Sequence, residues 1–257
     1  MKFDIIWIKK IIAIIKTIFW KNPNIIYINS NKKKFDKGDV DSHVEVRNRK
    51  WVLCQTDSKL GFKFEKHHFK KMKFCLFQIL RNCSDVTSIV YAGYVSPMFA
   101  IYDGYCLGDS RNYVFVDTRK SKSESYEIRY KKKFIKQDID FDYSSEEINV
   151  LVNSSSDIAL AKCKKCKTYF YNEKCKDKID NQYLTKVYSF IKSLLDLSTN
   201  SSVKRVNLYV SSRQPVSFVI GTAIQSSHPP VFVYEFDQGE YKDQILLQEG
   251  KIIEEKI

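Results

Sequence analysis

The stretches SIVYAGYVSPMF at residues 88–99 and VNLYVSSRQPVSF at residues 206–218 share one order of features. Each begins with a short apolar run, continues into a polar loop, and reaches a proline that opens a second apolar stretch. Short apolar runs are typical of strands that are buried on both faces. Proline fits the first turn of a helix, where its missing N–H has no partner to lose. Each stretch therefore predicts a strand, a loop and a helix in that order.

The two stretches also continue alike, which indicates a duplicated unit. The number of residues from Pro97 to the next apolar run at Tyr113 equals the number from Pro215 to Val231. Each predicted helix carries one glycine, and each following strand ends in an acidic residue. Duplicated βαβ units explain this shared order, and a chance match of short apolar runs is the alternative. Further strands are expected at 51–54, 126–130, 148–152 and 245–247, and an amphipathic helix is expected at 65–81.

Composition permits a protein that binds anions. The 257 residues are enough for one large domain or two small ones in close contact. The formal net charge of +13 favours partners such as nucleotides, nucleic acid or an acidic membrane face. The alternative is that lysine runs such as 32–34, 70–71 and 131–133 are ordinary solvated surface.

The cysteines and histidines favour a non-enzymatic, metal-free protein. Seven scattered cysteines and no secretory cleavage pattern favour a reducing, cytoplasmic compartment. Cys163, Cys166 and Cys175 resemble three zinc ligands, but a structural zinc site normally needs four. We therefore expect ordinary thiols and no metal or cofactor. His67 and His68 are expected to be solvated on the polar side of their helix, and no catalytic set is recognisable.

The N-terminal segment FDIIWIKKIIAIIKTIFW, residues 3–20, predicts an amphipathic helix. Lys2, Lys9 and Lys16 share one face, and isoleucines cover most of the rest. The apolar run is short for a bilayer span, which needs ~20 apolar residues. A helix in the membrane surface, a helix docked on a partner and a core helix all stay open. The expected organisation is a helix at 1–22, a linker at 23–48, and a domain at 49–250 whose halves cover about 49–140 and 141–250.

The loops before Pro97 and Pro215 are the predicted ligand site. They lie at the start of a helix and just past the carboxyl end of a strand, the edge where open α/β sheets bind ligands. Free backbone N–H groups and the helix dipole favour phosphate there. Arg213 can contact phosphate with two donors, and Tyr94 can stack on a base. For the serines, an ordinary turn or helix cap is the alternative.

At these residues the chain resembles a SAVED domain. That family consists of two fused halves, each similar to a CARF sensor domain, and it occurs in bacterial antiphage systems. The resemblance extends over roughly residues 51–248. It is carried by residues 89–93, Ser96-Pro97-Met98-Phe99, Gly104, residues 115–119, Pro215, Phe218, Gly221, residues 233–235, Tyr241 and residues 245–247.

The resemblance implies a sensor that binds a cyclic oligonucleotide, namely a cyclic oligoadenylate or a related cyclic tri- or tetranucleotide. The messenger would come from a CBASS nucleotidyltransferase or from a type III CRISPR polymerase subunit. The halves would be related by a pseudo-two-fold repeat. The predicted ligand-binding residues are Gly93, Tyr94, Ser96, Pro97, Ser154, Ser155, Ser211, Ser212, Arg213 and Gln214.

The expected output is ligand-induced, head-to-tail self-assembly that triggers an antiviral effector. Relatives usually carry an effector domain before the sensor, and the roughly fifty residues here are too few for an enzyme domain. The partner is therefore expected to be a separately encoded effector, or a membrane surface reached through residues 1–22. The alternatives are an enzyme that degrades the messenger and a protein that only sequesters it.

Overall fold

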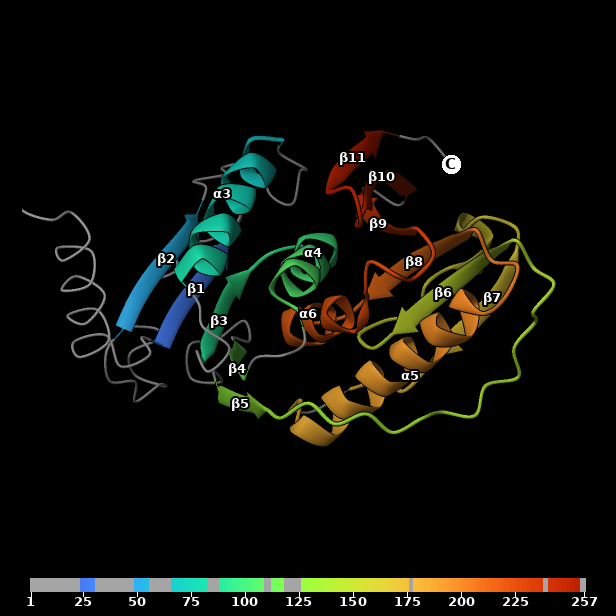
Figure 1. Ribbon diagram of the computed structural model, residues 1–257, viewed down its shortest axis with the longest axis horizontal. Coiled ribbons are helices and arrows are strands. Elements are labelled where there is room, and N and C mark those ends of the chain that lie inside the picture. The colour runs from blue at the N-terminus through green and yellow to red at the C-terminus, as the bar shows by residue number, and fades with distance from the viewer. Residues whose placement is uncertain are drawn as a thin grey trace, which may run out of the picture.

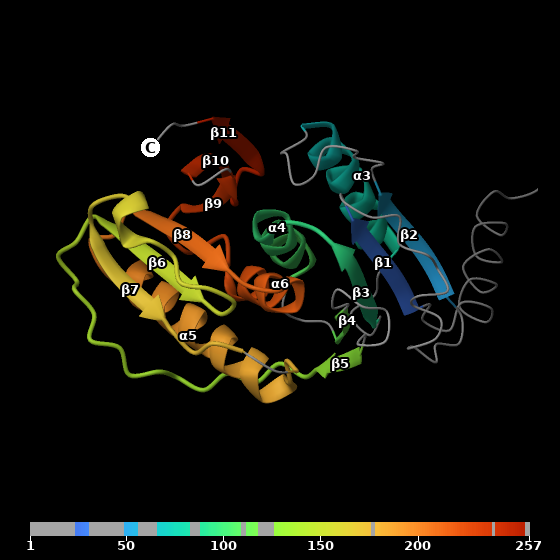
Figure 2. The same ribbon diagram turned by 180° about the vertical axis from the view of Figure 1, so that it is seen from behind.

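A computed structural model describes residues 24–30, 49–55, 66–82, 88–108, 112–117, 126–175, 178–237 and 240–254. These residues form two β-sheets with helices α4 and α6 packed between them (Figures 1 and 2). The fold is therefore α/β, as the sequence predicts. The predicted helix within residues 1–22 lies outside the described residues.

The first half contains a sheet of five described strands. The four strands β2, β1, β3 and β4 are parallel, and β5 adds an antiparallel edge. Helix α3 packs on β2, and α4 connects β3 to β4. The strands are β1 (Asn24–Ser30), β2 (Arg49–Gln55), β3 (Ile89–Tyr94), β4 (Tyr113–Asp117) and β5 (Tyr126–Tyr130), and the helices are α3 (Lys66–Asn82) and α4 (Pro97–Leu107).

The second half repeats this arrangement. Its sheet has the order β7-β6-β8-β9-β10-β11, with β7, β6, β8 and β9 parallel and the last two strands antiparallel. The units β3-α4-β4 and β8-α6-β9 correspond, so the predicted duplication is confirmed at the level of elements. The elements are β6 (Glu147–Asn153), a 3-10 turn (Leu160–Lys162), β7 (Lys167–Tyr171), α5 (Asn181–Thr199), β8 (Arg205–Ser211), α6 (Gln214–Ala223), β9 (Val231–Asp237), β10 (Glu240–Leu246) and β11 (Lys251–Glu254).

The predicted linker at 23–48 is wrong in its first part. Asn24–Ser30 form β1, which lies between β2 and β3 inside the first sheet. The run Ile25–Ile28 is completely buried, because a central parallel strand has side chains covered on both faces. Residues 31–48 lie outside the described part of the chain.

Two expectations for α3 are also corrected. His68 is buried rather than solvated, and its Nε2 lies 3.0 Å from Asn29 Oδ1 of β1. Phe74 and Phe77, which the sequence pattern places on the apolar side of the helix, are 60% and 61% exposed. Phe69 and Met72, which the same pattern places on that side, do face the core. Apolar side chains on two faces made the inward face ambiguous.

Helices α4 and α6 cross through their glycines. A Cβ atom on Gly104 would lie 2.0 Å from the Phe218 carbonyl oxygen, and a Cβ on Gly221 would lie 2.0 Å from the Ile101 carbonyl oxygen. Gly104 thus faces Phe218, three residues before Gly221, and Gly221 faces Ile101, three residues before Gly104. A two-fold relation between the halves would produce this reciprocity, although the axis itself stays a prediction.

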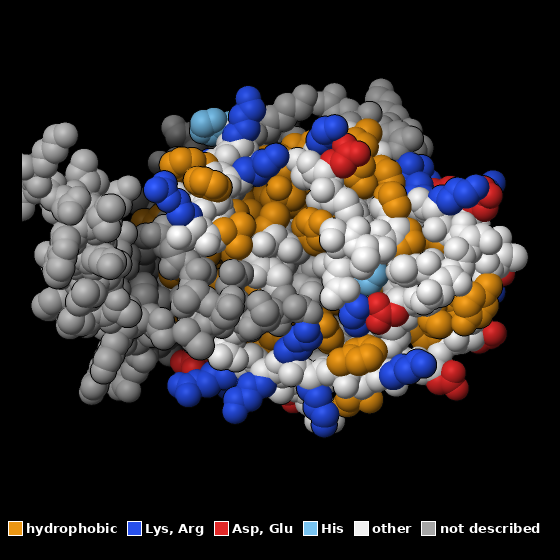
Figure 3. All heavy atoms as spheres, in the orientation of Figure 1, with side chains coloured by type: hydrophobic (Ala, Val, Ile, Leu, Met, Phe, Trp, Pro, Cys, Tyr) orange, Lys and Arg blue, Asp and Glu red, His pale blue; other side chains and the backbone are white. Residues whose placement is uncertain are grey.

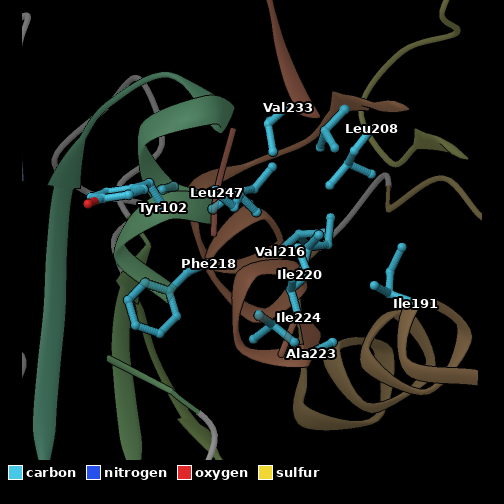
Figure 4. Packing of buried hydrophobic residues seen from close by; sticks show 14 of the residues in the cluster. Tyr102, Ile191, Leu208, Val216, Phe218, Ile220, Ala223, Ile224, Val233 and Leu247 are labelled. Carbon is cyan, nitrogen blue, oxygen red and sulfur yellow. The ribbon is translucent and has the colours of Figure 1, made fainter. Parts of the chain in front are cut away.

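One hydrophobic core spans both halves. Phe218 projects from α6 toward the strands of the first half (Figure 4), and its ring centroid lies 4.4 Å from that of Tyr91 and 4.9 Å from that of Tyr113. Aromatic burial of this kind supplies a large share of core stability. The two halves therefore form one folding unit.

An extended segment, residues 131–146, joins the halves along α5 (Figure 1). Ile135 N–H donates to Ser189 Oγ at 3.0 Å, and Gln137 N–H donates to Ser193 Oγ at 2.9 Å. The predicted boundary near residue 140 falls inside this segment. Among the described helices, none combines the length and apolar character that a bilayer crossing requires.

Candidate ligand pocket

A cavity of about 510 Å³ lies where the two halves meet. Its size is within the ~300–1,000 Å³ range of small-molecule sites. The beginning of α4 reaches it, as do the carboxyl ends of β8 and β9 and Ser212 in the loop before α6. Its lining consists of Ser96, Pro97, Ser155, Ser156, Asp157, Ile158, Ala159, Val210, Ser211, Ser212, Tyr234, Glu235, Phe236 and Tyr241.

The first half contributes the start of α4. Ser96 is the N-cap residue, with extended backbone angles of −62° and 155°, and Pro97 opens the helix. Ser96 is only 3% exposed, yet its Oγ has no hydrogen-bond partner in the described part of the protein. A buried hydroxyl without a partner costs free energy. At a helix N-terminus, where N–H groups are also unpaired, this hydroxyl is suited to hold an anion.

The second half contributes a serine-rich loop tied to the end of β8. The N–H groups of Ser154 and Ser155 donate to the Ser211 carbonyl oxygen at 2.9 and 2.8 Å. Ser156 N–H donates to Ser211 Oγ at 3.1 Å. Ser212 Oγ lies 2.6 Å from the Ser217 Oγ of α6. These bonds fix the loop against the helix start, so the pocket wall is pre-formed.

An aromatic and acidic wall closes the other side, and sequence reasoning missed it. Tyr234, Glu235 and Phe236 end β9, and Tyr241 faces them from β10. Phe236 is 53% exposed, whereas Tyr234 and Tyr241 are buried. The signal in the sequence was the run of alternating aromatic residues at the end of a predicted strand.

Five of the predicted ligand residues line the pocket, and five do not. Those that line it are Ser96, Pro97, Ser155, Ser211 and Ser212. Gly93, Tyr94, Ser154, Arg213 and Gln214 are absent from its wall. The structure therefore brings together the two predicted loops, although it orients half of their side chains elsewhere.

The five predicted ligand residues that do not line the pocket have the following surroundings. Gly93 has a φ of +127°, and a Cβ there would lie 1.9 Å from the Asn29 carbonyl oxygen. The buried Ser154 accepts a hydrogen bond from the Tyr183 hydroxyl at 2.8 Å. Arg213 Nη2 donates to Cys175 Sγ at 3.3 Å. Tyr94 is partly exposed at the end of β3, and Gln214 forms the first turn of α6. Their roles in binding stay predictions.

A buried polar network lies beneath α4. Asp103 accepts hydrogen bonds from Tyr27 Oη at 3.0 Å, Asn29 Nδ2 at 2.6 Å and Tyr91 Oη at 2.6 Å. Burial raises the pKa of Asp103 to about 7, although these hydrogen bonds oppose the shift. Burial lowers the pKa of His68 to about 4, so its ring is neutral at neutral pH and donates from Nε2 to Asn29.

The cysteine cluster does not gather metal ligands. Within the described residues, no three His, Cys, Asp or Glu side chains come close enough to hold a metal ion. Cys163 donates to the Ala159 carbonyl oxygen at 3.7 Å, and burial raises its pKa to about 11. Cys163 is therefore protonated at neutral pH.

Two α/β halves, each built on a mainly parallel sheet with one antiparallel edge, define a Rossmann-like fold. Lys and Arg side chains are spread over the described face in Figure 3, with Asp and Glu among them, rather than gathered in one patch.

Comparison with solved structures identifies the particular fold. The Cap4 SAVED/CARF-domain containing receptor of Acinetobacter baumannii with 2′3′3′-cAAA matches with a TM-score of 0.55 and 11% identity, over 91% of this chain and 53% of that one. The same receptor with 3′3′3′-cAAA matches with a TM-score of 0.53 and 12% identity, over 91% and 53%. The Cap4 receptor of Moraxella osloensis matches with a TM-score of 0.52 and 13% identity, over 91% and 52%.

The chain thus has the SAVED/CARF fold, and the resemblance seen in its sequence is confirmed at the level of fold. It spans about half of the length of each of these receptors. No protein-family model matches the chain, and no curated protein matches it.

Proposed function

We propose that this chain is a sensor that binds a cyclic oligonucleotide in the cavity at the start of α4, where the two halves meet. The observation that carries the proposal is Ser96, a buried hydroxyl without a partner in the described residues, at a proline-initiated helix start that lines the cavity. The start of α4 and the serines of the facing loops offer donors that suit a ligand with phosphate groups. Support also comes from the Cap4 receptors of the same fold, which were solved with cyclic trinucleotides.

Isothermal titration calorimetry tests this proposal. The panel consists of 2′3′3′-cAAA, 3′3′3′-cAAA, the corresponding cyclic tri- and tetranucleotides of the other bases, and linear pApA. We expect saturable binding of at least one ring and little binding of linear pApA, because the ring places several phosphates at once. Flat titrations with every ring would refute the proposed function.

We propose that the chain leaves its ligand intact and responds by assembling. Ligand-induced, head-to-tail stacking would produce species larger than the monomer, which light scattering coupled to gel filtration measures. The ring that binds should increase the mass, and linear pApA should not. A bound protein of unchanged mass would contradict assembly. Recovery of a linearised ring from the same sample would favour the alternative, an enzyme that degrades the messenger.

The output partner is part of the same proposal. A separately encoded effector, or a membrane surface contacted by residues 1–22, would receive the signal. The setting would be an antiviral system of the CBASS or type III CRISPR kind.

A further inference from the structure

We propose that the outer face of α3 is a membrane-contact surface, on which Phe74 and Phe77 insert into an anionic bilayer while basic side chains beside them contact lipid phosphates. The inference rests on the membrane form of the proposed output and adds to it a second contact besides residues 1–22. It does not involve the ligand cavity, because α3 contributes no residue to the lining of that cavity.

The exposed face of α3 carries one straight stripe of side chains, which consists of Lys70, Phe74, Phe77 and Arg81. Their spacing of four, three and four residues places them along a single line of the helix. All four are exposed, and the two phenylalanines are exposed by 60% and 61%. Leu80, the residue before Arg81, is also exposed. The stripe therefore has an apolar middle and a cation at each end.

The two phenylalanines of the stripe take no part in the core of the first half. The opposite side of α3 makes the core contacts, through Phe69, Met72 and Ile79. In the described part of the chain, neither Phe74 nor Phe77 belongs to a hydrophobic cluster. Large apolar side chains that are grouped and uncovered mark interaction sites. We therefore interpret the stripe as a surface for a partner.

The charge of α3 selects an anionic partner that also accepts apolar side chains. Residues 66–82 include four lysines and one arginine and contain no Asp or Glu. Figure 3 shows hydrophobic side chains at the surface over α3, with Lys and Arg side chains around them. Helices that lie in a membrane surface combine aromatic residues and leucine with lysine and arginine in this way. The long basic side chains reach the phosphates while the rings lie deeper.

The stripe ends on the side of the molecule where residues 1–22 join the fold. His68 Nε2, near the start of α3, lies 3.0 Å from Asn29 Oδ1, near the end of β1. Because α3 connects the parallel strands β2 and β3, it runs antiparallel to them, and it lies beside β1 and β2 (Figure 1). Its last turn, with Leu80 and Arg81, therefore lies toward Asn24, at the beginning of β1.

Two contacts at one end of the molecule suit a single membrane surface. Stable attachment takes two weak contacts, because a single one gives only marginal and reversible binding. Joined in one chain, the two contacts reinforce each other. We therefore expect that neither α3 nor residues 1–22 alone holds the protein on a membrane.

Co-sedimentation of the full-length protein with vesicles tests the proposal. One set of vesicles contains equal parts of phosphatidylglycerol and phosphatidylcholine, and the other contains phosphatidylcholine alone. We expect the wild type to bind the anionic vesicles at least about 10-fold more tightly, because each lysine or arginine near an anionic surface contributes about fivefold.

Two double variants separate the apolar part of the stripe from its charge. Phe74→Ser/Phe77→Ser should weaken binding to the anionic vesicles by roughly 10- to 100-fold, because it removes most of the apolar area that inserts. Lys70→Gln/Arg81→Gln should weaken the same binding by roughly 10- to 30-fold and leave binding to neutral vesicles unchanged.

Matched controls come from the exposed surface outside α3. Phe170→Ser removes an aromatic side chain that is 42% exposed on β7. Lys136→Gln/Lys165→Gln removes two exposed cations from the joining segment and the loop before β7. Both controls should bind vesicles as the wild type does, and thermal unfolding shows whether each variant is folded.

The outcomes distinguish the α3 surface from the rest of the proposed function. A wild type that binds anionic vesicles, together with unchanged binding of either α3 variant, would overturn the α3 surface and leave the contact of residues 1–22 intact. A wild type that stays in the supernatant would overturn both membrane contacts, whereas the calorimetric titration with the rings tests the sensor independently. A dimer of the wild type that Phe74→Ser/Phe77→Ser abolishes, without vesicle binding, would assign the stripe to a second copy of the chain and overturn the membrane surface.

Discussion

The buried hydroxyl of Ser96 has no hydrogen-bond partner in the described part of the protein. Replacing such a group by an apolar one of similar shape is nearly neutral or stabilising. The Ser96 side chain makes no capping hydrogen bond to α4, so its removal should not cost the stability that is usually lost with an N-cap serine. We therefore interpret the hydroxyl as a ligand contact.

Ser96→Ala should leave the melting temperature unchanged or slightly raised, and should weaken ligand binding by about 5- to 10-fold, as for one lost hydrogen bond. Calorimetric titration and thermal unfolding measure the two effects. Ser189→Ala is the control, because the Ser189 hydroxyl on α5 accepts a hydrogen bond from Ile135 N–H and does not line the cavity. That variant should lose about 1 kcal/mol of stability and keep its affinity. Equal affinity of Ser96→Ala and wild type would remove Ser96 from the site.

Asp103 predicts a pH-dependent stability. Its pKa in the folded protein, about 7, lies above the ordinary value of 3.8, so folding favours the protonated carboxyl. The stabilisation of the folded protein that comes from this preference is fully present below pH 4 and disappears as the pH rises through 7. It amounts to a few kcal/mol at about 1.4 kcal/mol per pKa unit.

The measurement compares the free energy of unfolding of wild type and Asp103→Asn between pH 4.5 and 8. The wild type should lose stability relative to the variant as the pH rises. The pKa of His68 in the folded protein is lowered to about 4, so His68 makes the folded protein less stable as the pH falls below 6.5. This effect is common to both proteins and cancels in the difference between their free energies of unfolding. Parallel curves would show that Asp103 is ionised throughout this range.

At the scale of elements, the crossing of α4 and α6 depends on two glycines. Helix propensity alone favours alanine over glycine by about 1 kcal/mol. At Gly221, however, a Cβ would lie 2.0 Å from the Ile101 carbonyl oxygen, so the helices would have to separate. Such overpacking costs typically 1–3 kcal/mol.

Gly221→Ala and Gly104→Ala should each lower the free energy of unfolding by about 1–3 kcal/mol. The double variant should lose less than the sum, because a single separation of the helices relieves both clashes. Urea denaturation measures all three. Gly108→Ala is the control: Gly108 has a φ of +74° and a ψ of −173°, a backbone region essentially restricted to glycine, and a Cβ there would meet no atom within 4 Å. The variant should therefore show only the backbone cost of about 1–3 kcal/mol. Additive losses would contradict a shared contact.

At the scale of the whole molecule, residues 1–22 are the part of the chain proposed to reach a membrane. Deleting them should abolish sedimentation with anionic liposomes, because the isoleucines and lysines of the segment provide both apolar area and charge. The deletion ends before β1 begins at Asn24, so both sheets should stay intact. Unchanged calorimetric binding of the ring would verify this. Full-length protein that stays in the supernatant would contradict membrane contact and favour a protein partner.

The sequence determined the duplicated unit, because short buried strands and proline-initiated helices are encoded locally. Pro97 and Pro215 located the helix starts, and the loops before them do meet at the cavity. Strand β1 escaped prediction although Asn22 and Pro23 mark a break before it, because the four apolar residues 25–28 are too few for their periodicity to identify a strand.

Tertiary structure alone decided which side chains face the pocket. Along the loops, Ser96 and Ser211 line the cavity while Ser154 pairs with Tyr183, and residue type does not distinguish these serines. The wall at Phe236 is formed only when β9 and β10 pair and α4 packs against α6. Local pattern fixes the periodicity of each element, whereas the direction of a loop side chain depends on partners far away in the chain. For that reason the sequence predicted which loops meet at the cavity, and the packing of the two halves determined which residues line it.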